Sequence, residues 1–315
     1  MALTAAGVDC GTNSIRLLIA DVAGDGGLRD VHRETRIVRL GQGVDATGQF
    51  APDAIARTRA ALADYAELLR MHGVERVRMV ATSAVRDVAN RDVFFAMTAD
   101  VLGAVLPGAV AEVISGTEEA ELSFRGVVSE LDSARGPFVV VDLGGGSTEI
   151  VLGDGGVAAS YSADIGCVRL TERCLHSDPP TPEEVAAARR VVVEGLDAAL
   201  RVVPVESART WIGLAGTMIT LSALAQNMTT YDAAAIHLSR IASSDLLAVC
   251  DRLIGMTRAQ RAALPPMHVG RADVIGGGAI VAEELARELR ARAGIDELIV
   301  SERDILDGIV LSIAG

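Results

Sequence analysis

The sequence predicts an α/β protein made of two similar lobes. Segments with the period of strands alternate with segments of helical spacing along the chain. The start of this order recurs 133 positions later, where Asp142-Leu143-Gly144-Gly145-Gly146-Ser147 agrees with Asp9-Cys10-Gly11-Thr12-Asn13-Ser14 at Asp, Gly and Ser. A chain of 315 residues also exceeds the roughly 100 to 200 residues of one ordinary domain. A doubled unit of this kind favours two lobes that face each other.

The first lobe is predicted over residues 1–125. Its three opening strands form a meander, because short apolar runs alternate with turns that contain Gly and Asn. The apolar positions of the next segment recur at helical spacing, and Gly73 stands where that helix ends. The predicted elements are strands at 5–9, 15–22 and 34–40, a helix at 52–72, a strand at 77–82, a helix opened by Asn90, a strand at 109–114 and a helix from about Thr117.

The second lobe is predicted over residues 126–303, with a closing helix at 304–315 that can pack back on the first lobe. Its first strand is purely apolar and ends in Asp142, as the first strand of the chain ends in Asp9. The predicted elements are strands at 138–142, 149–153 and 157–166, a helix at about 182–200, a strand at 211–216 that runs into a helix, a long helix at 272–292 and a final strand before the closing helix.

The composition excludes several kinds of site. All 29 Lys+Arg residues are arginine, so the chain has no lysine for a P-loop, a Schiff base or a polybasic tail. A net charge of −13 argues against extended binding of nucleic acid or anionic membranes. No apolar run reaches the roughly 20 residues of a membrane span and no signal peptide is evident, so we expect a cytoplasmic protein. Neither disulfide nor metal spacing is found among the cysteines, which are expected to be free buried thiols: Cys10, Cys167, Cys174 and Cys250.

Two Gly-rich turns that follow buried strands are candidate phosphate-binding loops. Each comes after an aspartate and exposes backbone N–H groups with little side-chain bulk in the way. One such turn is equally well explained as an ordinary connection between strands, but two copies on two lobes favour anion binding. Because the chain is acidic and its long-range field is screened beyond roughly 8 Å at physiological salt, local donors must hold the phosphate. The candidates are Gly11, Thr12, Asn13 and Ser14 in the first turn and Gly144, Gly145, Gly146, Ser147 and Thr148 in the second.

Carboxylates beside these turns are candidate metal ligands. Asp142 and Glu149 flank the second turn, so a chain reversal over 143–148 brings both to the mouth of one hairpin. Carboxylate oxygens suit Mg²⁺, which keeps several waters and bridges to phosphate. The alternative is that Glu149 is an ordinary exposed strand residue. Asp9 is a third candidate, from the other lobe.

Two adjacent glutamates open the helix that is predicted from about Thr117. Ser115 and Glu118 have the spacing of a capping box, which gives Glu118 a structural role. Glu119 has no such role and points about 100° away on the helix. It is a candidate general base, which would accept a proton from a water that attacks phosphorus. The alternative is an exposed glutamate in the first helical turn.

Further segments offer anion-binding groups. Arg86 follows a strand and two hydroxyl residues, and its planar guanidinium can grip phosphate through two hydrogen bonds; the alternative is a surface pair with Asp87. Gly216 and Thr217 lie where a strand runs into a helix, a position that favours anions, although helix packing explains the glycine equally well. Three glycines at 276–278, inside a predicted helix, are expected to let another backbone or a ligand approach.

These motifs resemble those of the exopolyphosphatase and guanosine pentaphosphate phosphohydrolase (Ppx/GppA) family, in its short two-domain form, within the fold of actin, Hsp70 and the sugar kinases. DCGTNS (9–14) is similar to the family's first phosphate loop and VVDLGGGSTE (140–149) to its second. ISGTEEAEL (114–122) resembles a signature that the kinases and filament proteins of the fold lack. The resemblance covers nearly the whole chain and implies two ribonuclease H-like lobes with a cleft between them.

The resemblance also implies a role for each matching residue. Glu119 would be the general base, and Asp142 and Glu149 would hold Mg²⁺ or Mn²⁺, with Asp9 as a further candidate. The implied substrate is inorganic polyphosphate, or alternatively pppGpp, which loses a terminal phosphate to water. A homodimer that binds neither nucleic acid nor membrane is expected. Phosphate contacts are implied for Asn13, Ser14, Arg86, Gly145, Gly146, Ser147 and Thr148.

Two positions depart from the family pattern. Glu121 stands where the family often has Arg, and Leu306-Asp307-Gly308 stands where it often has Arg-Glu-Gly. The loss of two cations, in a chain that ends after two lobes, favours short polyphosphates. It also leaves open a catalytically weak relative that senses polyphosphate or an alarmone. A sugar kinase or filament-forming ATPase of the same fold is disfavoured by the Glu-Glu segment.

Overall fold

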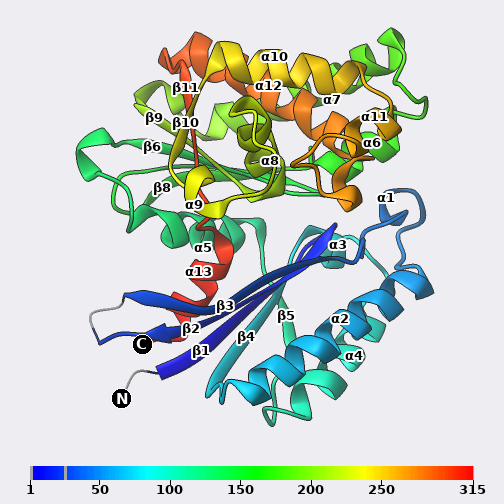
Figure 1. The fold of residues 1–315 in the computed structure, drawn as a ribbon, viewed down its shortest axis with the longest axis vertical. Helices are drawn as coiled ribbons and strands as arrows, with labels where there is room; N and C mark the ends of the chain where they lie inside the picture. The colour runs from blue at the N-terminus through cyan, green and yellow to red at the C-terminus, as the bar shows by residue number, and fades with distance from the viewer. Residues whose placement is uncertain (1–2, 25–26, 315) are drawn as a thin grey trace. The chain divides into compact units, whose positions relative to one another are not determined.

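The computed structural model describes residues 3–24 and 27–314. The chain divides into two compact units, of which one comprises Met1–Ser129 and Ile305–Gly315 and the other comprises Glu130–Asp304. Each unit has its own sheet and its own core (Figure 1). Within the described residues, no helix is long and apolar enough to cross a membrane.

A five-stranded mixed sheet lies at the centre of the first unit. Its elements are β1 (Leu3–Cys10), β2 (Ser14–Val22), β3 (Leu28–Ile37), α1 (Val44–Thr47), α2 (Pro52–Met71), β4 (Arg76–Ala81), α3 (Ser83–Arg86), α4 (Arg91–Gly103), β5 (Ala111–Val113), α5 (Gly116–Val128) and α13 (Ile305–Ser312). The strand order is β3-β2-β1-β4-β5, with β1 to β3 antiparallel and β4 and β5 parallel to β1. The predicted meander is confirmed, although its third strand, predicted at 34–40, spans Leu28–Ile37.

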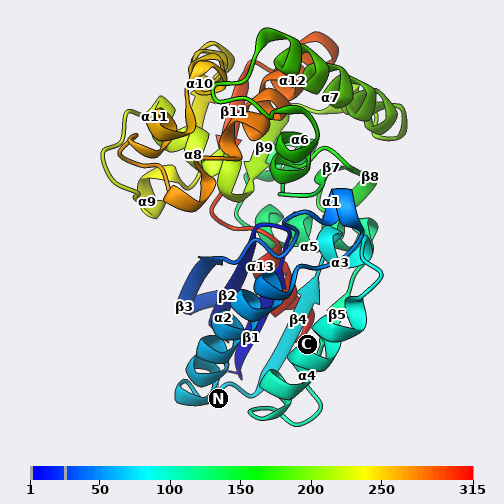
Figure 2. The same ribbon diagram turned by 90° about the vertical axis from the view of Figure 1, so that its right-hand side faces the viewer.

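Alternate side chains of β1 build a core on each face of this sheet. Ala6, Val8 and Cys10 are buried with residues of α2 and α4, whereas Ala5 is buried on the other face with residues of α5 and α13. This alternation follows from the two-residue period of a strand. Figure 2 shows α2 and α4 on one side of the strands and α13 on the other.

The closing helix α13 belongs to the first unit, although it is the last element of the chain. Gly308 permits its contact with α5, because a Cβ there would lie 2.0 Å from the carbonyl oxygen of Leu122. Asp307 is buried and accepts a hydrogen bond from Arg33 of β3 at 2.7 Å. Leu306 is buried in the same core. Packing and one ion pair therefore explain the Leu-Asp-Gly triplet.

The second unit repeats the plan of the first and extends it. Its elements are β6 (Phe138–Leu143), β7 (Thr148–Gly153), β8 (Val157–Ala163), α6 (Cys167–Cys174), α7 (Pro182–Val202), β9 (Thr210–Leu214), α8 (Ala215–Ala225), α9 (Ala233–Ile236), β10 (Ser239–Ala242), α10 (Ser243–Gly255), α11 (Arg258–Ala262), α12 (Ile275–Ala293) and β11 (Glu297–Val300). The strand order is β10-β11-β9-β6-β7-β8. As in the first unit, the first three strands (β6, β7 and β8) form an antiparallel meander. Strand β9 pairs in parallel with the free edge of β6, as β4 does with β1.

Some elements of the second unit were not predicted from the sequence. The strand predicted to run to residue 166 ends at Ala163, and α6 begins at Cys167 after Gly166 as its N-cap. Between α8 and α12 the structure adds α9, β10, α10 and α11. Helix α6 has only 8 residues, which is too short to be stable alone, so its position depends on tertiary contacts with a neighbouring loop and with the core.

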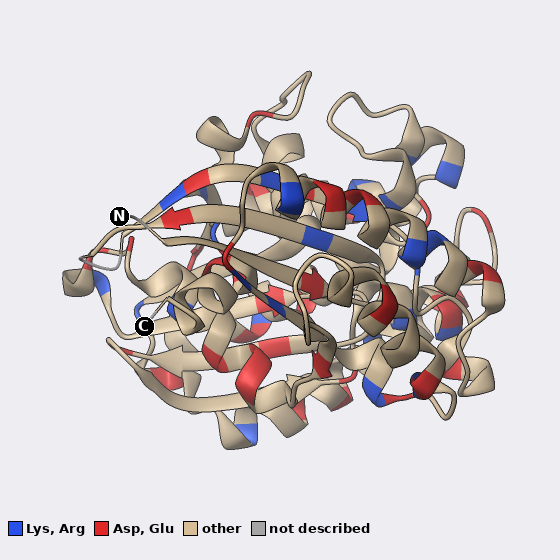
Figure 3. Ribbon diagram, turned by 90° about the horizontal axis from the view of Figure 1, so that it is seen from below, with Lys and Arg blue, Asp and Glu red and all other residues tan. Residues whose placement is uncertain are grey.

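Charged residues are spread over both units. In the view of Figure 3, ribbon segments with arginine and segments with acidic residues are interspersed. Ion pairs account for part of this pattern: Arg78, for example, contacts Glu112 at 2.5 Å and Glu118 at 2.6 Å. Arginine thus serves to neutralise nearby carboxylates within each unit.

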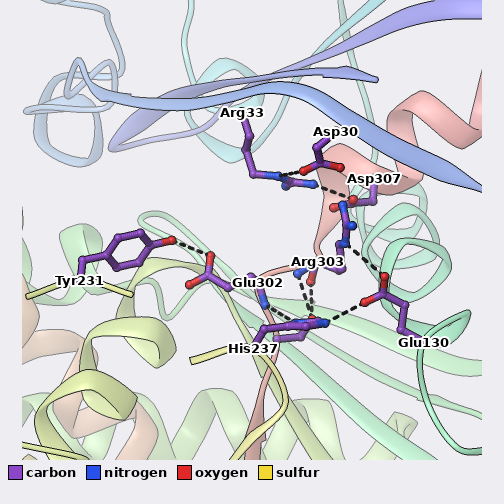
Figure 4. Close-up of polar contacts among 9 residues, drawn as sticks. Asp30, Arg33, Glu130, Tyr231, His237, Glu302, Arg303 and Asp307 are labelled. Atoms are coloured by element: carbon purple, nitrogen blue, oxygen red, sulfur yellow. Dashed lines mark hydrogen bonds and ion pairs between the residues drawn. The ribbon is translucent and has the colours of Figure 1, made fainter. Parts of the chain in front are cut away.

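A polar network holds together the segments where the chain enters and leaves the second unit (Figure 4). Glu130, the first residue of that unit, contacts Nε2 of His237 at 2.8 Å and Nε of Arg303 at 3.2 Å. The backbone N–H of Glu302 donates to Nδ1 of His237 at 3.2 Å. Because Nδ1 is an acceptor, the proton of this ring lies on Nε2, which donates to Glu130. His237 therefore links the entering and leaving segments.

Candidate active-site residues

The first candidate loop is the turn between β1 and β2. The N–H of Gly11 donates to the carbonyl of Ser14 at 2.9 Å. The carbonyls of Thr12 and Asn13 accept hydrogen bonds from the backbone of residues 38–41, just after β3. In the described part of the chain, the N–H groups of Thr12 and Asn13 have no acceptor. The loop thus uses its carbonyls internally and keeps two N–H donors that an anion can take.

The second loop, between β6 and β7, is built in the same way. Gly144 donates to the carbonyl of Ser147 at 3.1 Å, the bond equivalent to that of the first loop. The carbonyls of Gly144 and Gly145 accept the N–H groups of residues 167–169, the first turn of α6, at 2.8 to 3.1 Å. No acceptor is found, among described residues, for the N–H groups of Gly145 and Gly146. Both predicted loops therefore have the same hydrogen-bond design.

Two residues that the sequence analysis missed hold the second loop in place. Gly166 lets α6 approach, because a Cβ there would lie 2.3 Å from the backbone of Gly145. Arg169 donates from Nε to the carbonyl of Gly146 at 2.7 Å, and its side chain is only 11% exposed. In the sequence, Gly166 was the only hint of this close contact, and a single glycine could not be interpreted before the position of α6 was known.

The hydroxyl groups of the loops have different surroundings. Thr148 is buried, and its hydroxyl donates to the carbonyl of Ile165 at 3.1 Å, so its proton is used within the unit. The hydroxyl of Thr12 is buried and has no hydrogen-bond partner within the described residues. An unmade hydrogen bond of this kind costs about 1 to 3 kcal/mol, a cost that a bound anion would remove.

A pair of charged residues flanks each loop on neighbouring strands. Asp142 of β6 lies opposite Glu149 of β7, and both are buried, so the alternative of an exposed Glu149 is wrong. Opposite residues of antiparallel strands share a face, with Cβ atoms about 5 Å apart. Glu149 accepts a hydrogen bond from Ser162 of β8 at 2.7 Å. In the first unit, Asp9 lies opposite Arg16, whose Nε and Nη2 donate to Asp9 Oδ2 at 2.9 and 2.6 Å.

The two pairs differ in what they offer to a divalent cation. Asp142 and Glu149 are two buried carboxylates on one face, which fits Mg²⁺, an ion usually held by one or two carboxylates, water and phosphate. Asp9 already shares its carboxylate with a guanidinium. Over residues 3–24 and 27–314, no group of three or more His, Cys, Asp and Glu side chains is arranged to hold a metal ion. The residues present therefore fit an ion held by one carboxylate pair.

Glu119 lies in the first turn of α5 and is buried, so the alternative of an exposed glutamate is wrong. Its Oε2 accepts a hydrogen bond from Nη1 of Arg86 at 2.8 Å. The same nitrogen donates to the carbonyl of Ile114 at 3.0 Å. Two residues that the sequence marked separately thus form one ion pair.

The neighbouring glutamate differs in part from its predicted role. The N–H of Glu118 donates to Oγ of Ser115 at 3.1 Å, as a capping box requires. Its carboxylate binds Nη2 of Arg78 at 2.6 Å instead of the backbone of Ser115. Only half of the capping box is formed, because an arginine of the adjacent strand β4 competes for the carboxylate.

Gly216 and Thr217 lie in the first turn of α8. The guanidinium of Arg271 contacts Gly216, where a Cβ would lie 2.3 Å from it, and Nη1 donates to the carbonyl of Gly216 at 3.4 Å. Packing therefore explains this glycine. The contact also places a cation at the helix N-terminus, a feature the sequence analysis missed.

The three glycines of α12 make room mainly for side chains. A Cβ at Gly276 would lie 2.6 Å from the guanidinium of Arg261, and one at Gly278 would lie 2.7 Å from Thr217. At Gly277 the carbonyl of Cys167 would be 2.8 Å away, so the expected approach of another backbone is confirmed there. This packing places α12 against both α6 and α8.

Comparison with known proteins adds a family to this geometry. The model of the Ppx/GppA phosphatase family matches residues 18–313. The chain is 79% identical to Exopolyphosphatase 2 of Mycobacterium tuberculosis, over 100% of both chains. It is 31% identical to a guanosine-5′-triphosphate,3′-diphosphate pyrophosphatase of Photobacterium profundum, over 71% of this chain and 44% of that protein.

The fold has a close match among solved structures. The crystal structure of an exopolyphosphatase-like protein matches with a TM-score of 0.92 and 42% identity, over 99% of this chain and 97% of that one. The predicted class, α/β with two ribonuclease H-like lobes of the actin, Hsp70 and sugar-kinase fold, is confirmed.

Proposed function

The chain belongs to the Ppx/GppA phosphatase family, and from this membership we propose that it is an exopolyphosphatase, which releases the terminal phosphate of inorganic polyphosphate by attack of water. The observation that carries the proposal is the 79% identity, over its full length, to a protein named Exopolyphosphatase 2. Hydrolysis needs a positioned water, a base, anion donors and charge neutralisation, and the described residues include groups for each role.

Glu119 is the proposed general base. Its carboxylate is buried and held by Arg86 at 2.8 Å, which limits its orientation. A carboxylate in this state can accept the proton of the attacking water. The guanidinium of Arg86 has five N–H donors in all, so it can contact a phosphate oxygen while it retains the bond to Glu119.

Phosphate is proposed to bind at the two Gly-rich loops. In the first loop, the N–H groups of Thr12 and Asn13 and the buried hydroxyl of Thr12 are the donors that support this role. In the second, they are the N–H groups of Gly145 and Gly146. Arrays of backbone N–H groups bind phosphate oxygens without lysine.

Asp142 and Glu149 are proposed to hold a divalent ion, Mg²⁺ or Mn²⁺. Both carboxylates are buried and lie opposite each other on one sheet face, and carboxylate oxygens are ligands that Mg²⁺ accepts, which supports this assignment. When bound, such an ion neutralises charge on the phosphoryl group that is transferred. Ser162, which donates to Glu149 at 2.7 Å, orients that carboxylate.

Short polyphosphates are the proposed substrates. Glu121 is exposed and acidic at a position where the family resemblance leads us to expect arginine, and Leu306 is buried in the core. Neither position can therefore supply a cation to a long polyanion.

The first prediction tests the base. Changing Glu119 to Gln keeps the size of the side chain but removes its proton-accepting charge. We expect phosphate release from short polyphosphate to fall by about 10² to 10⁴-fold, with an unchanged circular dichroism spectrum.

Glu118→Gln is the matched control, because this adjacent acid binds Arg78 and not Arg86. Its turnover should stay near that of the unchanged protein. If Glu119→Gln retains near-normal turnover on short polyphosphate, the assigned mechanism is wrong.

A pppGpp 5′-phosphohydrolase is the alternative activity, and the likeness to the Photobacterium pyrophosphatase favours it. A comparison of kcat/KM for polyphosphate and for pppGpp, on one preparation, separates the two. Binding without turnover of either substrate would instead identify a catalytically weak sensor.

We also propose that the protein is cytoplasmic and that it forms a homodimer. All four cysteines are free, as is usual for cytoplasmic proteins. The family resemblance is the basis for a homodimer, which sedimentation equilibrium would detect.

A further inference from the structure

The two repeats place side chains of different charge at equivalent positions. In the first unit, Asp9 of β1 is paired in register with Arg16 of β2. In the second unit, Asp142 of β6 is paired in register with Glu149 of β7. The same offset of 133 positions relates Asp9 to Asp142 and Arg16 to Glu149. The turns between the strands also share the hydrogen bond from a Gly N–H to a Ser carbonyl.

Because the strand register and the turn hydrogen bond are the same in both units, the two pairs differ in the charges of their side chains. The Asp9–Arg16 pair sums to zero, whereas the Asp142–Glu149 pair sums to −2. Arg16 makes two hydrogen bonds to Asp9, at 2.9 and 2.6 Å, and the two side chains are only 14% and 5% exposed. A carboxylate buried in this way needs a cation close to it.

We infer that Arg16 occupies, in the first unit, the role that a divalent ion has in the second. It positions Asp9 beside the first phosphate loop and keeps metal ions away from that carboxylate. Of these two pairs, only Asp142 and Glu149 then hold a divalent ion, and Asp9 is not one of its ligands. This inference rests on the proposed function, because the ion at Asp142 and Glu149 is part of that proposal.

The number of bound ions provides a test that does not depend on turnover. Mn²⁺ is titrated into the full chain without substrate and followed by electron paramagnetic resonance and by calorimetry. The unchanged protein should bind one Mn²⁺ per chain. The double variant Asp142→Asn/Glu149→Gln should lose that ion, and Asp9→Asn should keep it with an unchanged dissociation constant.

Arg16→Glu supplies the decisive variant, because it creates in the first unit the Asp–Glu pair of the second. We expect it to bind a second Mn²⁺ ion, and we expect Mn²⁺ to raise its Tm by more than it raises that of the unchanged protein. If Arg16 had only a structural role, the Arg16→Glu substitution would lower the Tm without adding a bound ion. Arg16→Met, which removes the cation and adds no ligand, should lower the Tm and still bind one ion.

The outcomes separate this inference from the proposed function. If Asp9→Asn weakens Mn²⁺ binding, or if a folded Arg16→Glu variant still binds one ion, the inference about Arg16 is overturned. If Arg16→Glu does not fold, the result for Asp9→Asn decides the question alone. If the Asp142/Glu149 double variant keeps its ion, the metal site of the proposed function is wrong instead.

Discussion

Half-buried arginines determine what the carboxylates beside them can do. Arg86 fixes Glu119 at 2.8 Å in the first turn of a helix, where the carboxylate would be costly to bury without a partner. Local motifs identified each residue as a candidate for the site. Because 33 positions separate them, the sequence pattern did not predict that they form an ion pair. Arg16 carried no motif at all, although extending the alignment of the two repeats past the loops pairs it with Glu149.

Cysteine reactivity is a further property at the scale of single residues. Cys10, Cys167 and Cys250 are buried, and Cys174 is half-buried. Burial raises the pKa of the Cys167 thiol to about 11, from an ordinary value of 9.0. The prediction of free buried thiols is thus confirmed for three of the four.

We therefore expect a thiol reagent at about pH 8 to modify Cys174 first in the native protein, and all four cysteines only after unfolding. Ellman's reagent with peptide mapping measures the order of modification.

The raised pKa of Cys167 also predicts a pH dependence of stability. Between about pH 9 and 11 the unfolded chain releases the Cys167 proton while the folded chain keeps it, so the free energy of unfolding should fall as pH rises through this range. Thermal unfolding at a series of pH values measures this loss of stability. Rapid native labelling of Cys167 would contradict the burial.

At the scale of elements, close backbone contacts position the pieces around the candidate site. Helix α6 donates the N–H groups of its first turn to the second loop, and the glycines of α12 admit side chains of neighbouring segments. Most strands and the helices α2, α7 and α12 could be predicted from periodicity and turn residues, whereas β10 and α10 were missed. Helix α6 was missed as well, because its 8 residues depend on tertiary contacts, both with the loop carbonyls that it binds and with the core that it shares with α7 and α12.

The contact of α13 with α5 gives a prediction at this scale. A Cβ at Gly308 would lie 2.0 Å from the carbonyl oxygen of Leu122. Gly308→Ala should therefore destabilise the first unit by about 1 to 3 kcal/mol or more, despite the better helix propensity of Ala. Urea unfolding, monitored by hydrogen exchange in β1, measures the change.

Gly103→Ala in α4 is the matched control in the same unit. There the nearest atom to an added Cβ is 3.9 Å away, so the substitution should stabilise by up to about 1 kcal/mol. Equal effects of the two substitutions would show that the contact at Gly308 is not tight.

At the scale of the whole molecule, charge limits the substrate. The chain carries −13 and no lysine, and several of its arginines are committed to carboxylates, among them Arg16, Arg33, Arg78 and Arg86. A long polyphosphate would therefore meet net repulsion beyond the two candidate phosphate loops.

We expect kcat/KM to be highest for polyphosphates of a few phosphates and to fall as the chain lengthens. Added salt should reduce this difference, because it screens the repulsion. A phosphate-release assay over a series of chain lengths, at two ionic strengths, measures both. A kcat/KM that rises steadily with length would contradict the assignment to short substrates.

The sequence by itself determined the doubled α/β plan, the two Gly-rich loops, the acid pair Asp142 and Glu149, and the family. These features are local or repeated, so spacing and residue type suffice to recognise them. Only the tertiary structure decided which charges meet: Arg86 with Glu119, Arg16 with Asp9, Arg78 with Glu118, and Asp307 with Arg33. Such pairs join residues on different elements, and their partners follow from sheet register and helix packing, which no local pattern encodes.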